Sequence, residues 1–247
     1  MQPIEVACPD IGPLRVMGRR LHYGHDFVIR SNAKSTFFDY LLFFDSRGVS
    51  REFDQSLADQ LITSISRSGK TYLLICRPLE LTLWATLIRF LTLNKLCPGK
   101  IITNMGFVDF TPKKQSILRD AVLQVEAAVG FGVAETCYVE DYAAADGIIP
   151  LYIMRFHDAY RRAIEAIVQQ HEMVIVNTPL TDPKLSIKRK RPVSFFSAQA
   201  ESNEFNRAID GAQIIDLPDF DETLTYDAVH FTCRGNELIF DRLKGYL

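Results

Sequence analysis

Two short segments of the chain carry residue types that can do nucleophilic chemistry. The first is Asp45-Ser46, which follows an apolar run, and the second is Asp227-x-x-His230, just before the last helical segment. An Asp three residues ahead of a His can hydrogen-bond one ring nitrogen while the other faces a serine hydroxyl, which activates the serine. Both segments also have a structural interpretation, in which Ser46 and Asp227 cap helices and His230 packs against one.

The elements that would position these residues form an α/β pattern. From residue 38 onward, short apolar runs alternate with longer segments of helical period, which favours one doubly wound parallel sheet covered by helices. In such a sheet, ligands bind outside the carboxyl ends of the strands, so a site should combine residues that directly follow strands. The expected strands are Phe38 to Phe44, Thr71 to Cys76, Lys100 to Met105, Met173 to Asn177 and Gln213 to Asp216, and the expected helices cover about 50–66, 79–94, 113–129, 151–171, 194–209 and 232–246.

The strand and helix count predicts one main domain over residues 36–247. Residues 1–35 are expected to be an N-terminal extension packed on it, in which Val16–Met17 and Phe27–Ile29 could be two edge strands. The segment Asp182–Pro192 is rich in Lys and Arg between prolines. It is a loop by composition, and it either contacts an anionic group or is simply solvated.

Composition excludes several classes of protein. The 247 residues are 47 % hydrophobic and 23 % charged with a net charge of -2, so neither a disordered chain nor a nucleic-acid partner is expected. Five scattered cysteines without a C-x-x-C pair favour a reduced, cytoplasmic protein. The most apolar stretch, Leu79–Leu96, is interrupted by Glu80, Arg89, Asn94 and Lys95 and predicts a buried helix, not a membrane span. No secretory signal is visible at the N-terminus.

Two patterns that would imply a bound phosphate or metal fail. Ser66–Thr71 ends like a phosphate-binding loop, but its first glycine is missing and it leads from a helix into a strand, the reverse of what the mechanism needs. His22 and His25 lie close together without further ligands at metal-binding spacing. We therefore expect no metal and no cofactor.

The two candidate segments together resemble blocks of the SGNH, or GDSL-type, hydrolase family, over roughly residues 38–247. The last block matches best, because Asp227, His230, Thr232, Gly235 and Asn236 agree with D-x-x-H-x-T-x-x-G-N. Asp45–Ser46 resembles the first block, with Phe44 in place of its glycine. The resemblance implies a three-layer αβα fold with a flavodoxin-like five-stranded parallel sheet. It also implies Ser46 as nucleophile, His230 as base and Asp227 as the residue that orients it.

Two blocks depart from the family. The third reads Gly106-Phe107-Val108-Asp109, so Val108 replaces the asparagine that donates an oxyanion hydrogen bond. The second lacks its glycine, since Cys76 is followed by Arg77. Losing one oxyanion donor typically costs ~3 kcal/mol, or ~10²–10³ in rate, unless another group substitutes.

Five further residues at or just after the ends of expected strands are candidates for the oxyanion or substrate-binding role: Arg47, Arg77, Asn104, Gly106 and Asp109. Arg77 or Asn104 could replace the missing donor, next to Gly106. Arg47 could bind an anionic group of a substrate, or it could pair with Asp45 or Asp109. The aromatic residues Trp84, Phe107, Phe110 and Tyr142 could form an apolar or sugar-stacking wall, or belong to the core.

The resemblance favours a serine esterase that removes a small acyl group, acetyl above all, from an ester substrate that could be a glycan. An O-acyltransferase would use the same three residues. The alternative of a different class is a non-hydrolytic member of the fold that binds a ligand or a partner, as the missing asparagine and glycine suggest. The sequence does not decide the oligomeric state.

Overall fold

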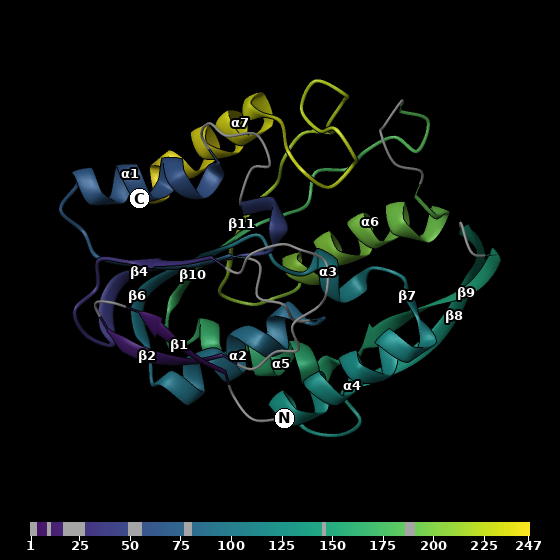
Figure 1. Ribbon diagram of the computed structural model, residues 1–247, viewed down its shortest axis with the longest axis horizontal. Helices are drawn as coiled ribbons and strands as arrows, with labels where there is room; N and C mark the ends of the chain where they lie inside the picture. The colour runs from purple at the N-terminus through teal and green to yellow at the C-terminus, as the bar shows by residue number, and fades with distance from the viewer. Residues whose placement is uncertain are drawn as a thin grey trace.

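A six-stranded sheet forms the centre of the molecule in the computed structural model, which describes residues 4–8, 11–16, 28–48, 56–76, 81–144, 147–185 and 191–247 (Figure 1). Five strands are parallel and lie in the order β11-β10-β6-β4-β5. This is the flavodoxin-like order that the resemblance implies, so the fold class is confirmed. The five are β4 (Phe37–Phe44), β5 (Tyr72–Cys76), β6 (Cys97–Thr103), β10 (Glu172–Val176) and β11 (Gln213–Ile215).

Helices cover both faces of this sheet, and the alternation of side chains along each strand decides which face packs on which helices. Leu41 and Phe43 of β4 pack on one side with α2, α4 and α5, whereas Leu42 and Phe44 pack on the other side with α1 and α7. Figure 1 shows the resulting three layers. The helices are α1 (Leu57–Arg67), α2 (Leu83–Asn94), α4 (Gln115–Val129), α5 (Asp158–Val168) and α7 (Cys233–Leu243).

The sheet has one strand more than expected. β3 (Val28–Ser31) runs antiparallel along β5 at the edge of the sheet, so this part of the N-terminal segment is an edge strand. β1 (Ile4–Cys8) and β2 (Gly12–Val16) form a separate hairpin, and Leu14 and Val16 of β2 pack into the core beside α2. Met17 and Phe27 lie outside the described residues, as do His22 and His25.

The expected helix 151–171 is wrong over its first third. Residues Gly147–Phe156 form β9, which pairs with β8 (Ala134–Ala144) and β7 (Lys113–Lys114) in a three-stranded antiparallel sheet, and α5 starts only at Asp158. The apolar run from Ile148 to Met154 suits either period, and the pairing partner β8 decides for the strand. The hairpin β8–β9 therefore interrupts the regular alternation of strands and helices between α4 and α5.

The remaining helices place residues at the carboxyl edge of the parallel sheet. α3 (Phe107–Phe110) follows β6, and the short 3₁₀ helix η1 (Ser46–Gly48) follows β4. α6 (Val193–Arg207) packs against α3, and a second 3₁₀ helix, η2 (Lys244–Tyr246), ends the chain. No helix within the described ranges is long and apolar enough to cross a membrane.

Candidate active site

The candidate site lies where the winding of the sheet reverses. β4 and β6 are neighbours there, although β5 lies between them in the chain, and Asp45 and Asn104 directly follow the two strands. The Asn104 side chain bridges the gap, because its Oδ1 accepts the Asp45 N–H at 3.0 Å and its Nδ2 donates to Asp45 Oδ1 at 3.1 Å. The amide of Asn104 is thus directed at Asp45.

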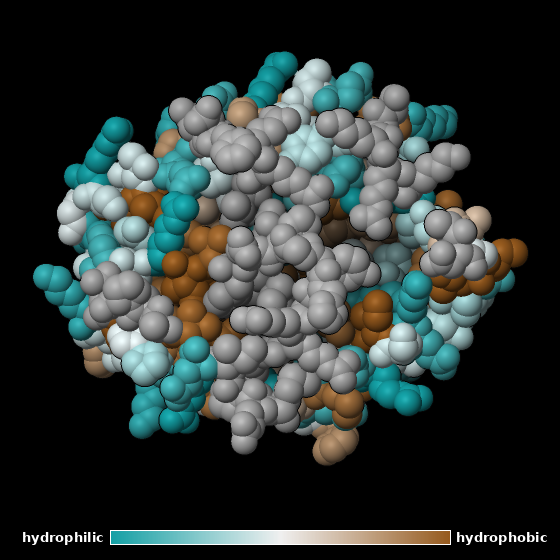
Figure 2. Space-filling view, viewed as in Figure 1, coloured by the Kyte–Doolittle hydropathy of each residue, from teal (hydrophilic) through white to brown (hydrophobic). Residues whose placement is uncertain are grey.

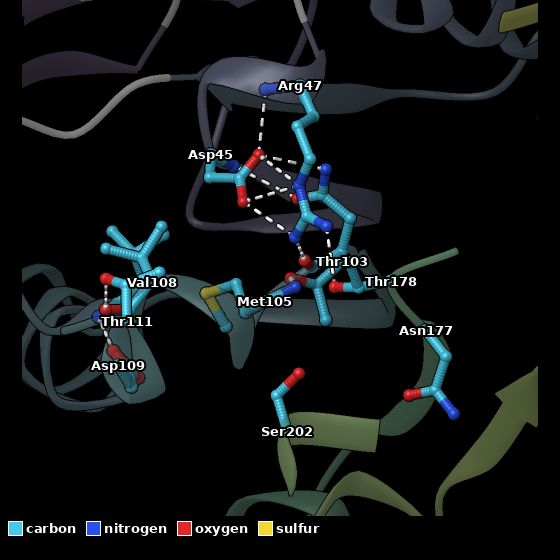
Figure 3. A network of polar contacts seen from close by, with 12 residues as sticks. Asp45, Arg47, Thr103, Met105, Val108, Asp109, Thr111, Asn177, Thr178 and Ser202 are labelled. Atoms are coloured by element: carbon cyan, nitrogen blue, oxygen red, sulfur yellow. Dashed lines mark hydrogen bonds and ion pairs between the residues drawn. The ribbon is translucent and has the colours of Figure 1, made fainter. Parts of the chain in front are cut away.

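Arg47 pairs with Asp45, which is one of the two alternatives left open by the sequence. Its Nε donates to both carboxylate oxygens of Asp45, at 3.0 and 2.8 Å, and its Nη2 lies 2.7 Å from Oδ2. Nη1 donates to Thr178 Oγ1 at 2.6 Å, and Nη2 also donates to the Asn104 carbonyl. Because Arg47 is only 2 % exposed and all three of its nitrogens have partners, the guanidinium holds the ends of β4, β6 and β10 together (Figure 3).

Asp227 and His230 form the second pair that the sequence predicts. His230 Nδ1 lies 2.8 Å from Asp227 Oδ2, and Asp227 Oδ1 accepts the backbone N–H groups of Val229 and His230 at 3.1 and 2.7 Å. Burial alone would raise the pKa of Asp227, but the hydrogen bonds from the ring and backbone of His230 outweigh it and hold that pKa well below its usual value. The carboxylate is therefore ionised at neutral pH and fixes the orientation of the ring.

His230 opens onto a cavity of about 540 Å³. Phe107 and Val108 of α3, Phe195 of α6 and residues of the hairpin β8–β9 also line it. The guanidinium carbon of Arg47, which is not a lining residue, is 5.2 Å from the centre of the Phe107 ring. Of the four aromatic residues considered, Phe107 and Tyr142 line the cavity, whereas Trp84 and Phe110 belong to the core.

Ser46 directly follows Asp45 as the first residue of η1 and is half-buried. Its hydroxyl makes no hydrogen bond with His230 or with any other residue in the described ranges. The backbone N–H groups of Ser46 and Gly106 likewise donate to no residue that the structure describes. Arg77, the other proposed donor, lies outside the described residues.

Gly106 is a position where the backbone requires glycine. Its φ is +112°, and a Cβ there would come within 3.0 Å of the Asn206 amide. Asn206 in turn donates from Nδ2 to the Met105 carbonyl at 3.1 Å and to Asn177 Oδ1 at 3.0 Å. Gly106 therefore allows α6 to approach the end of β6 closely.

Asp109 and Lys113 are buried but do not reach Arg47. The Asp109 carboxylate accepts the first N–H groups of α2, from Leu83 and Trp84, and burial raises its pKa to about 7. Lys113 Nζ donates to the carbonyls of Val108 and Thr111 at 2.6 and 2.9 Å, and burial lowers its pKa to about 8. Asp109 thus links α3 to the start of α2, and Lys113 binds carbonyls at the end of α3. Among the described residues, no carboxylate lies within hydrogen-bond reach of Lys113.

The side-chain amides on the buried side of α6 were not predicted from the sequence. Gln199 accepts the Thr181 N–H at 3.1 Å and donates to the Ala228 carbonyl at 3.2 Å. Asn203 exchanges two hydrogen bonds with the backbone of Thr178. Polar residues recur at positions 199, 203 and 206, and this helical spacing could have predicted a polar face on α6.

Arg191, which lies near the end of the basic segment Asp182–Pro192, was also not predicted to belong to the site. Its Nη2 lies 3.3 Å from Asp227 Oδ2, and its guanidinium carbon is 4.6 Å from the centre of the Phe195 ring. It lines the same cavity as His230.

No group of three or more residues of the described ranges has the composition and arrangement of a metal site.

Comparison with known proteins gives structural matches only. No protein-family model and no curated protein sequence matches the chain. The crystal structure of the acetyl xylan esterase AlAXEase matches with a TM-score of 0.43 and 14% identity, over 84% of this chain and 99% of that one. A putative GDSL-like lipase from Parabacteroides merdae gives 0.41 and 12%, over 83% and 93%, and Est1E from Butyrivibrio proteoclasticus gives 0.39 and 10%, over 100% and 97%. At these scores the likeness is loose, so we take the function from the geometry of the site.

Proposed function

We propose that the protein is a serine-dependent carboxylic ester hydrolase with Ser46 as nucleophile, His230 as base and Asp227 as the residue that orients the base. The observation that supports this most strongly is the Asp227–His230 pair, because a locked carboxylate holds a ring that opens onto a large cavity. Ser46 follows the central strand β4 at the same carboxyl edge, where doubly wound folds bind their ligands.

The proposed reaction proceeds through an acyl-enzyme. Asp227 accepts a hydrogen bond from the N–H of Nδ1, so Nε2 of His230 is unprotonated and takes the proton of the Ser46 hydroxyl as its oxygen attacks the ester carbonyl. The tetrahedral intermediate expels the alcohol, which receives that proton from His230. A water molecule, deprotonated by the same Nε2, then releases the acid and restores the serine.

The oxyanion must be stabilised without the asparagine that Val108 replaces. Arg47 is committed to Asp45, Asn104 and Thr178, and the Asn104 amide faces Asp45. We therefore assign the role to the backbone N–H groups of Ser46 and Gly106. With one side-chain donor fewer, we expect turnover ~10²–10³ below that of a complete site.

Hydrolysis of p-nitrophenyl acetate by the wild-type protein and by the Ser46→Ala variant tests the proposal. We expect the wild type to hydrolyse the ester and the variant to hydrolyse it at least ~10³-fold more slowly. A fluorophosphonate probe should label Ser46, as mapped by mass spectrometry, and the label should be lost in His230→Asn. Equal rates for wild type and Ser46→Ala, or labelling at another residue, would overturn the assignment.

The second candidate function is ligand or partner binding without hydrolysis. Val108 in the donor position and the lack of a Ser46–His230 hydrogen bond among the described residues favour it. Catalytic hydrogen bonds are often long without substrate, so we rank it second. An O-acyltransferase would share all three residues and would pass the acyl group to another hydroxyl instead of water. Product analysis with acetylated and free sugars distinguishes it from the hydrolase, and also tests the acetyl and glycan substrates that the resemblance implies.

A further inference from the structure

The cavity beside His230 is far larger than an acetyl group requires. Its volume of about 540 Å³ falls within the ~300–1,000 Å³ of pockets that enclose drug-sized ligands. An acetyl group has only three non-hydrogen atoms and would leave most of this space unfilled. The remaining volume must therefore receive another part of the substrate or stay hydrated.

The lining shows which chemistry fits that space. Eleven of the sixteen lining residues are apolar or aromatic. They include Phe107 of α3 and Phe195 of α6, and Tyr142, Ile149 and Leu151 of the hairpin β8–β9. When an apolar group enters, water is released from such walls, and this release lowers the free energy of the system.

One face of the hairpin β8–β9 forms the outer wall. Tyr142 of β8 lies opposite Ile149 of β9 in the antiparallel register, and Leu151 follows two residues later on the same face. Ile148, one residue before Ile149, points to the other face and is 75% exposed. The patch of apolar side chains at the right-hand edge of Figure 2 lies where Figure 1 places this hairpin.

From this wall we infer that the substrate carries a medium-sized apolar group, a medium-length chain or an aromatic ring, which is buried between Ile149 and Phe107. The inference rests on the proposed function, because it places the ester next to His230. It also revises the expectation from the sequence, because an acetyl group would be only one part of what the site recognises. The apolar group belongs either to the acid or to the alcohol, and both sources have the same chemistry.

A chain-length series tests the inference in the acid and in the alcohol. We expect kcat/KM for p-nitrophenyl hexanoate to exceed that for the acetate by ~10-fold or more, or else kcat/KM for hexyl acetate to exceed that for methyl acetate by as much. Each buried methylene contributes ~0.8 kcal/mol, or about fourfold, and four are added in the acid series and five in the alcohol series. Similar values along both series would overturn the inference.

Ile149→Trp and Ile148→Trp form a matched pair of variants. The first fills the cavity and should lower the ratio of long to short ester at least ~5-fold, whereas the second makes the same change on the exposed face and should alter it by less than ~2-fold. Ile149→Phe replaces Ile149→Trp if that variant does not fold. An equal response of the ratio to both positions would contradict the assigned wall.

Binding to Ser46→Ala separates this inference from the proposed hydrolysis. We expect calorimetry to show that octanoate or hexyl acetate binds this variant more tightly than acetate or methyl acetate, and that Ile149→Trp weakens the binding at least ~5-fold. If this holds while no Ser46-dependent hydrolysis is found, the cavity is assigned correctly and the proposed function is wrong. If hydrolysis depends on Ser46 but neither binding nor rate responds to chain length, only the inference about the apolar group fails.

Discussion

The two turns that carry the candidate site use an aspartate in the same way but give it different partners. In the turn after β4, Asp45 Oδ1 accepts the backbone N–H of Arg47 at 2.8 Å, and in the turn before α7, Asp227 Oδ1 accepts that of His230 at 2.7 Å. Among the described residues, the second oxygen of Asp45 then binds only a guanidinium, which is enclosed on all sides. The second oxygen of Asp227 binds the His230 imidazole at the edge of a cavity, and the Arg191 guanidinium lies 3.3 Å from it.

This difference separates a structural pair from a chemical one. A guanidinium has no acceptor atom, and all three nitrogens of Arg47 already have partners, so the Asp45–Arg47 pair serves to hold the strand ends. An imidazole gains or loses its proton near neutral pH and needs one free ring nitrogen to do so. Only the Asp227–His230 pair meets that need.

Asp227→Asn should have the largest effect, and it should act on the rate. The amide would present a donor to Nδ1 and favour the tautomer with the proton on Nε2, which cannot accept the serine proton. We expect kcat for p-nitrophenyl esters to fall ~10³–10⁴-fold, equivalent to ~4–5 kcal/mol. The Asn oxygen can still accept the two backbone N–H groups, but the amide cannot pair with the Arg191 guanidinium, so the melting temperature should fall as well. A rate close to that of the wild type would remove His230 as the base.

Arg47→Leu should instead act on stability. It leaves the Asp45 carboxylate buried without its cation, and we expect the free energy of unfolding in guanidinium chloride to fall by ~3–5 kcal/mol. The double variant Asp45→Asn/Arg47→Leu serves as control and should lose less than the single one, because no charge remains uncompensated. If the single variant lost under ~1 kcal/mol, the enclosed pair would not hold the strand ends as described.

A third buried carboxylate, Asp109, pairs with no guanidinium of the described residues and should make stability depend on pH. Burial raises the pKa of Asp109 from 3.8 in the unfolded chain to about 7. Between pH 5 and 7 the folded state therefore binds more protons than the unfolded state, and stability falls as pH rises, by up to ~1.4 kcal/mol per pH unit. Urea unfolding at pH 5, 6 and 7 should show this slope in the wild type and a flatter one in Asp109→Asn. Equal slopes in the two proteins would show that Asp109 is not its source.

The smallest effect is expected for Arg207→Leu, which breaks an exposed pair of the same residue types. Arg207 Nη2 lies 2.7 Å from Asp216 Oδ1 at the end of β11, and both side chains are about half exposed. We expect a loss of at most ~1 kcal/mol in the free energy of unfolding, decreasing further in 0.5 M salt. A loss as large as that of Arg47→Leu would show that burial does not distinguish the two pairs.

The parallel sheet could be predicted from the sequence because each of its strands is a short apolar run followed by a helical segment. All five expected strands form, with ends shifted by at most three residues. The hairpin could not be predicted, since the run from Ile148 to Met154 fits either period and its partner β8 mixes apolar and polar residues, none of them fully buried. Local pattern cannot report a pairing that depends on a strand elsewhere in the chain.

Within the site, local spacing predicted the Asp227–His230 contact and long-range packing determined the rest. A D-x-x-H turn closes on itself, so its hydrogen bond follows from four consecutive residues. Apart from Asp45, the partners of Arg47 come from segments 57 and 131 residues away, and Arg191 contacts Asp227 across 36 residues. Such contacts exist only once the strands are in register, which a single sequence does not reveal.

The hairpin β8–β9 supplies a wall of the cavity while contributing no strand to the parallel sheet and no member of the proposed triad. Its length and side chains can therefore change without disturbing the residues that would carry out the reaction. Diversification of substrate range in relatives of this chain is thus expected to be concentrated in residues 134–156, and transplanting that segment between relatives is the natural way to exchange their preferences.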